Sequence, residues 1–175
     1  MKYTVPQSKH VFHTSECLTD SRKLEKMQKK LHYSESVSSI TLEQIADLYD
    51  SVGFGVADGY KSQENLLDRL FGHGCHGFFA IHDERLIGMV RVLSDDVICS
   101  WVAEACIHPD WQKQGVGRAL FNMVTRRFEH TSIYLEALSS QVGFFSKMGI
   151  HPESKLVACS LDPKAKPRSP IHFMH

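Results

Sequence analysis

The chain has 175 residues, 42% of them hydrophobic, and its 20 basic and 20 acidic side chains give a net charge of zero. This length fits one globular domain, and the balanced charge gives no electrostatic basis for binding nucleic acid or an anionic membrane. No apolar run approaches the roughly 20 residues of a membrane-spanning helix, and the segment 1–15 is too polar to resemble a signal peptide. We therefore expect a soluble, cytoplasmic protein with no nucleic-acid or membrane partner.

The cysteines favour reduced thiols. They are scattered, odd in number and never spaced as a CxxC pair, which argues against a disulfide framework or a zinc knuckle. His73, Cys75 and His76 lie close together in the sequence, but the glycines among them indicate a turn before a strand, and no second ligand pair has a matching spacing. We expect no metal site. The five cysteines are Cys17, Cys75, Cys99, Cys106 and Cys159.

Residues 1–30 are predicted to form an N-terminal extension that precedes the main domain. The apolar pair at 11–12 fits a short strand. After Asp20, a residue that commonly caps helices, apolar residues recur at helical spacing up to Leu31, which predicts a helix over 21–33. The role of this extension is open.

Two helices are predicted next. Thr41 is a candidate N-cap, with Glu43 or Gln44 at the capping-box position, and the glycines of segment 53–55 end this first helix. Ser62 is predicted to begin a second helix that carries the apolar residues of segment 66–71.

The remaining elements alternate between strands and helices, an order that predicts a mixed α/β sheet of about six or seven strands flanked by helices. The predicted elements are a hairpin of strands 78–81 and 86–92, a strand over about 97–107, a helix after Gly115, a strand at 133–137, a helix at 142–148 and a closing strand at 157–161.

The segment 107–120, IHPDWQKQGVGRAL, is the most informative part of the chain. Gly115 and Gly117 open an amphipathic helix, so backbone N–H groups and the positive end of the helix dipole can meet a phosphate there. A P-loop is excluded because no Lys followed by Ser or Thr comes after Gly117, and a dinucleotide fingerprint is excluded because its third glycine is Leu120. Without further context, the two glycines fit an anion site and a tight turn equally well.

A resemblance decides between them. Gln112, Gly115 and Gly117 resemble the pyrophosphate-loop motif of the GNAT superfamily of N-acetyltransferases, and the segment 143–150, GFFSKMGI, is similar to the family's second motif. The resemblance covers residues 31–161 and leaves a C-terminal tail at 162–175. It implies the GNAT fold, whose mixed, mostly antiparallel sheet is splayed at its central parallel strands.

The resemblance also implies transfer of an acetyl group from acetyl-CoA, the co-substrate, to a primary amine of a small molecule or protein. The loop would bind the pyrophosphate, the pantetheine arm would pair with a strand edge near Ile107, and the backbone N–H near Ile107 would face the thioester carbonyl. A homodimer is compatible with the sequence. The residues implied to bind CoA are Cys106, Ile107, Gln112, Lys113, Gln114, Gly115, Val116, Gly117, Arg118, Phe144 and Phe145.

The attacking amine must be neutral, so a base or a water relay to one is expected. Trp101 stands where many family members carry a Glu base, and the carboxylate left on this strand is Glu104. We expect Glu104 to bind the acceptor amine or to receive its proton through water; pairing with Arg91 on the neighbouring strand is the structural alternative. His108 is a weaker candidate for the base.

Phe145 stands where many members carry the Tyr that protonates the departing thiolate, and Leu138 replaces an Asn that bonds the pantetheine arm. These departures keep two other hypotheses open: a CoA-binding sensor or regulatory module without turnover, and an unrelated nucleotide-binding domain. The sequence does not identify the acceptor amine.

Overall fold

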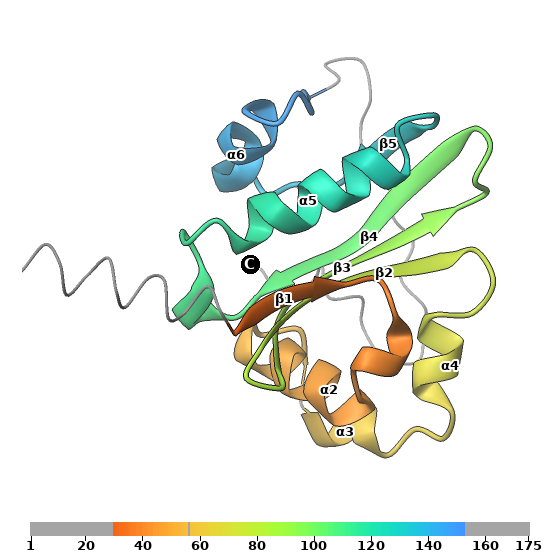
Figure 1. The fold of residues 1–175 in the computed structure, drawn as a ribbon, viewed down its shortest axis with the longest axis vertical. Helices are drawn as coiled ribbons and strands as arrows, with labels where there is room; N and C mark the ends of the chain where they lie inside the picture. The colour runs from red at the N-terminus through yellow and green to blue at the C-terminus, as the bar shows by residue number, and fades with distance from the viewer. Residues whose placement is uncertain (1–29, 56, 153–175) are drawn as a thin grey trace, which may run out of the picture.

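The computed structural model describes residues 30–55 and 57–152, which form a mixed α/β fold around one sheet. In Figure 1 the sheet runs between two groups of helices. Adjacent strands are antiparallel except β4 and β5, which are parallel. In spatial order, the strands are β1 (Leu31–Ser34), β2 (Cys75–His82), β3 (Arg85–Ser94), β4 (Cys99–Ile107) and β5 (Ser132–Leu135).

The sheet has five strands in the described part of the chain, fewer than the six or seven expected, and the parallel pair lies at one end of the strand order. The strands predicted at 11–12 and 157–161 lie outside the described residues. The helix predicted over 21–33 is wrong at its end, because Leu31–Ser34 pairs with β2 as strand β1. Residues 21–29 of that helix lie outside the described part.

Each face of the sheet is covered by helices, as Figure 1 shows. α5 (Val116–Arg127) and α6 (Val142–Ser146) lie on one face, and α2 (Leu42–Ser51), α3 (Ala57–Lys61) and α4 (Leu66–Leu70) lie on the other. The strand residues alternate between two apolar cores: Val90 and Val92 belong to the α5 core, whereas Phe79 and Met89 belong to the α2 core. Among the described residues, no helix is both long and apolar enough to cross a membrane.

Local sequence signals explain several boundaries. Thr41 caps α2 in a reciprocal capping box with Gln44, which confirms the predicted start of this helix. The predicted start of the second helix at Ser62 is wrong: that residue follows α3, and α4 begins only at Leu66, after Asn65 in a left-handed conformation. The β2–β3 turn is made by the predicted residues, here with Asp83 and Glu84 both at positive φ.

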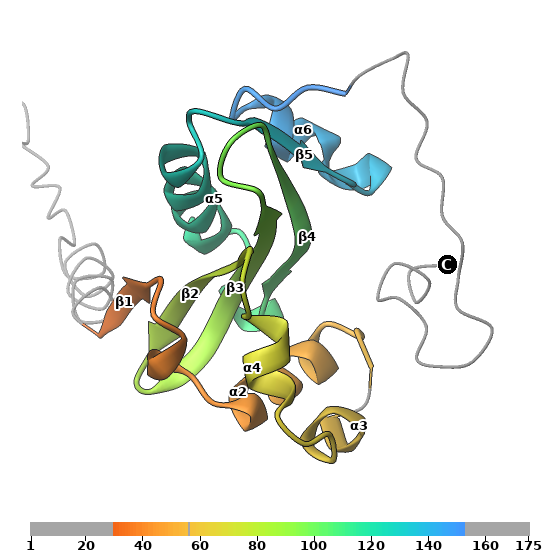
Figure 2. The same cartoon turned by 90° about the vertical axis from the view of Figure 1, so that its right-hand side faces the viewer.

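β4 and β5 run side by side over only part of β4. Their pairing ends at Val102 and Leu135, and β4 then continues to Ile107. The register of β3 against β4 also shifts at this point, so that Ala103 has no partner on β3, the sign of a β-bulge that bends the strand. Figure 2 shows β5 beside one end of β4 only. Among the described residues, no strand pairs with the far half of β4 on the β5 side, so this edge is open there.

Candidate functional site

The open edge of β4 offers unpaired backbone groups. The His108 N–H donates to the Ile87 carbonyl on β3 at 2.9 Å. Because successive N–H groups along a strand point in opposite directions, the Ile107 N–H points away from β3, toward the open side. An extended, amide-rich molecule can pair with such an edge as an added strand does.

The loop that follows β4 is held in shape by its own side chains. The Gln112 side chain donates to the Ile107 carbonyl at 3.0 Å, and that of Gln114 donates to the Asp110 carbonyl at 2.5 Å. Lys113 has a φ of 59° and Gly115 a φ of 88°. Both glutamine side chains therefore help to hold the shape of the loop, and their part in binding CoA stays a prediction.

Gly115 is the N-cap of α5 and carries no side chain that could cap it. The first N–H groups of the helix are consequently left to an external acceptor, which the helix dipole favours when it is an anion. Lys113 and Arg118 are exposed beside this point, and neither forms an ion pair within residues 30–55 and 57–152.

The two motifs, far apart in the sequence, meet in space. A Cβ added to Gly117 at the start of α5 would lie 3.6 Å from Phe144 Cζ on α6. Phe145, next to it, is buried and packs edge-on against Phe121 of α5 at 5.0 Å between ring centroids. Phe145 reaches the pocket beside β4, but its ring has no proton to donate.

Glu104 lies in a network of buried polar groups. Arg91 of β3 donates to both of its carboxylate oxygens, at 2.7 and 3.1 Å, and the Tyr49 hydroxyl of α2 donates to one of them. The side chains of Glu104 and Arg91 are only 10% and 16% exposed. The ion pair with Arg91, the structural alternative, is thus present, and Glu104 also lines the pocket.

The network shifts the titration of its members. Burial and the charge of Glu104 raise the pKa of Tyr49 far above its ordinary value, so the phenol stays protonated. Burial lowers the pKa of Arg91, but its hydrogen bonds to Glu104 and the charge of that carboxylate outweigh this effect, and the net shift is upward. Burial, and then Glu104, raise the pKa of the Cys106 thiol. Cys106 is 2% exposed and pairs with Met89 of β3, so its backbone polar groups point away from the open edge.

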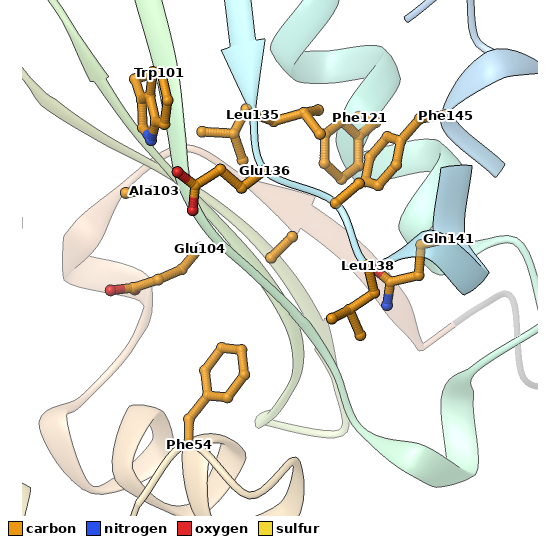
Figure 3. A pocket seen from close by; sticks show the side chains of 13 residues that line it. Phe54, Trp101, Ala103, Glu104, Phe121, Leu135, Glu136, Leu138, Gln141 and Phe145 are labelled. Carbon is orange, nitrogen blue, oxygen red and sulfur yellow. The ribbon is translucent and has the colours of Figure 1, made fainter. Parts of the chain in front are cut away.

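A pocket opens where β4 and β5 separate, and Figure 3 shows its lining. The lining combines apolar and aromatic side chains with two carboxylates, Glu104 and Glu136, and the described part of the chain contributes no Lys, Arg or His to it. Sequence reasoning did not identify Glu136, although a carboxylate within the predicted strand 133–137 was the available signal. The lining residues are Phe54, 101–105, Phe121, 135–138, Gln141 and Phe145.

Trp101, at the position of the usual base, lies at the pocket wall and stacks on Tyr134 of β5 with 6.3 Å between the centroids. His108 is directed elsewhere: its Nε2 lies 2.8 Å from the Arg85 guanidinium at the β2–β3 turn. Within the described ranges, no group of three or more His, Cys, Asp or Glu side chains is arranged to hold a metal ion.

The sequence profile of the Acetyltransferase (GNAT) family matches residues 42–150, which include the open edge, the loop and α6. The chain belongs to this family. The GNAT match ends at Ile150, in agreement with the second motif. It also accounts for the splayed β4–β5 pair as a family feature.

Two curated relatives are similar in sequence. The chain is 28% identical over 115 residues to the uncharacterized N-acetyltransferase ycf52 of Gracilaria tenuistipitata var. liui, across 64% of this chain and 63% of that protein. It is 25% identical over 134 residues to the ycf52 protein of Pyropia yezoensis, across 71% and 73%. The chain therefore spans somewhat less than two thirds of the Gracilaria protein.

Solved GNAT structures share the fold. A GNAT-family acetyltransferase from Streptococcus pneumoniae TIGR4 superposes with a TM-score of 0.60 at 21% identity, covering 77% of this chain and 98% of its own. An acetyltransferase from Trypanosoma brucei gives 0.57 at 15% identity, covering 75% and 99%. At these identities the likeness shows the fold alone.

Proposed function

We propose that this GNAT protein transfers an acetyl group from acetyl-CoA to a primary amine of a small molecule or protein, by direct attack within a ternary complex. The observation that carries the proposal is the joining of three features at one place: the uncapped N-terminus of α5, the open edge of β4 and the pocket beside Glu104. They match, in order, a pyrophosphate, an amide-rich arm and a reacting group.

Each feature supports one part of the reaction. The N–H groups of Val116 and Gly117 would bind the pyrophosphate, with Lys113 and Arg118 adding positive charge. The pantetheine amides would pair with β4, which brings the thioester to the Ile107 N–H. A backbone donor aimed at the developing oxyanion contributes on the order of 3 kcal/mol to the transition state.

In the chemical step, the neutral amine nitrogen attacks the thioester carbon, the C–S bond breaks, and the amide nitrogen loses a proton. The CoA thiolate leaves and takes up a proton from water, since Phe145 cannot supply one. A free thiol has a pKa near 8.5, so a thiolate is an adequate leaving group. Glu104, fixed by Arg91 and Tyr49, would accept a hydrogen bond from the amine or from a water that carries its proton away.

The test is the release of free CoA thiol from acetyl-CoA in the presence of a panel of primary amines. We expect release with at least one amine, and Glu104→Gln should lower kcat/KM sharply while acetyl-CoA affinity stays nearly unchanged. Binding of CoA without thiol release on any amine would favour a sensor module and refute the proposal. Unaltered kinetics in Glu104→Gln would reject only the role of that carboxylate.

A further inference from the structure

Glu136 occupies the point at which β4 and β5 part. The last pair of the parallel register is Val102 with Leu135, so Glu136 is the first residue beyond it, next to the unpaired Ala103. Pairing with β4 holds the β5 backbone as far as Leu135, and from Glu136 onward the two segments diverge. A side chain here stands at the inner end of the opening.

The direction of the Glu136 side chain follows from strand alternation. Leu135 packs into the α5 core, so its neighbour points to the opposite face. Figure 3 shows the Glu136 side chain directed toward Trp101 and Glu104, away from Phe121 and Phe145. Both carboxylates therefore lie on the same side of the sheet and line the same pocket.

The two carboxylates differ in how their charge is balanced. The charge of Glu104 is met by Arg91 at 2.7 Å. Glu136 is exposed and has no hydrogen-bond or ion-pair partner in the part of the chain that the structure describes. Because none of the lining residues within the described ranges is basic, the charge that these residues leave uncompensated in the pocket is that of Glu136.

The rest of the lining is apolar near this charge. Phe54, which follows α2, and Leu138, which follows β5, both line the pocket. Trp101 lines it as well, and the face of its ring attracts cations. One carboxylate among apolar side chains suits a cation carried on a carbon chain. It suits poorly an anionic or a neutral, strongly hydrated acceptor.

We propose that Glu136 is the residue that selects the acceptor: it binds the ammonium form of an alkylamine whose carbon chain lies against Phe54 and Leu138. Glu104, whose charge is already paired with Arg91, offers a hydrogen-bond acceptor deeper in the site and adds little net charge. The inference rests on the proposed function in that the bound amine is the acceptor of the acetyl group. The ammonium then loses a proton to solvent before attack.

The experiment compares Glu136→Gln with the wild-type chain, with Glu129→Gln as a matched control, since Glu129 is exposed just after α5 and does not line the pocket. Chemical-shift titrations in the presence of CoA measure the affinity for n-butylammonium and for 1-butanol, its neutral analogue. We expect Glu136→Gln to weaken n-butylammonium binding about fivefold, the range of an exposed ion pair, and to leave 1-butanol unchanged.

The wild-type affinity for n-butylammonium should also fall with added salt, whereas that of Glu136→Gln should not. Failure of n-butylammonium to bind the wild-type chain, or equal affinity in both, would overturn the inference. Loss of binding in Glu129→Gln as well would do the same, because the effect would then be one of general surface charge.

The outcome separates this inference from the function on which it rests. Thiol release from acetyl-CoA with an unchanged KM for the amine in Glu136→Gln refutes the role of Glu136 and leaves the acetyltransferase intact. Binding of n-butylammonium through Glu136 with no thiol release refutes the acetyltransferase and leaves the cation site intact. When both hold, Glu136→Gln raises the KM for the amine with little change in kcat.

Discussion

Replacing Arg91 by Met tests how strongly the buried network stabilises the fold. Arg91 is the only basic partner of Glu104 among the described residues, through hydrogen bonds of 2.7 and 3.1 Å, and both side chains are largely buried. Removing one member of a buried ion pair leaves an uncompensated charge and typically costs 3–5 kcal/mol. Since the pair keeps some contact with solvent, we expect a loss of about 3 kcal/mol in the free energy of unfolding.

For a chain of this length, each kcal/mol corresponds to about 2–4 °C in Tm, so Arg91→Met should melt about 6–12 °C below the wild type. Glu104→Gln alone should lose about 2 kcal/mol, because the guanidinium is left without its counter-charge. The double variant should lose only about 1 kcal/mol, since no charge remains and the Gln oxygen still accepts from Tyr49. The coupling between the two sites is then about 4 kcal/mol.

The assay is equilibrium unfolding in urea, which yields the free energy of unfolding for the four proteins of the cycle. Lys61→Met is the control: its ion pair with Asp47 has a similar 2.9 Å separation but is exposed to solvent, so we expect only a small loss in the free energy of unfolding. If the two single-variant losses add up to the double-variant loss within about 0.5 kcal/mol, the predicted coupling between Glu104 and Arg91 is absent. Glu104 and Arg91 would then be independent of each other.

Two further predictions concern backbone geometry and pH. Gly115→Ala forces a side chain into a φ of 88°, so we expect losses of about 1–2 kcal/mol in unfolding free energy and of roughly tenfold in CoA affinity, by urea titration and calorimetry; Gly143→Ala, in open space on α6, should change neither. Hydrogen bonds from the backbone N–H groups of Val97, Ile98 and Cys99 lower the pKa of Asp95. Its stabilising effect is therefore present above the unfolded pKa of about 3.9 and is lost as the pH falls through the lower folded value. Asp95→Asn should be less stable than the wild type at pH 7, and this gap should narrow as the pH falls below about 3.9 and through the folded pKa; a gap that does not narrow in acid contradicts this assignment.

Local signals predicted the parts of the fold that are encoded locally. The capping box at Thr41 lies within four residues, and Gly115 marks a loop position whose backbone is left-handed. β1 was missed because Leu31 continued a helical spacing, whereas the strand forms only because β2 is available as its partner. The short stretch of sequence around Leu31 does not include β2, so it could not predict this strand.

The same distinction applies to the site. The loop proposed to bind pyrophosphate is one continuous segment, so its pattern was visible. The Tyr49 contact with Glu104 joins residues from α2 and β4, and Glu136 gains its position from the divergence of two strands. These positions and contacts arise only when the sheet has assembled. The sequence shows which residue types are present but not which of them meet.

The chain contains two tryptophans, and the structure places one at each end of the proposed ligand path. Trp101 lines the pocket beside β4 and stacks on Tyr134, whereas Trp111 lies just before the loop proposed to bind pyrophosphate, with its ring 4.5 Å from that of His82. Indole emission depends on solvent contact and on neighbouring rings, so occupation of either end should alter a different fluorophore. The protein thus carries an intrinsic optical reporter for each of the two proposed substrates, and replacing either tryptophan by Phe isolates the signal of the other.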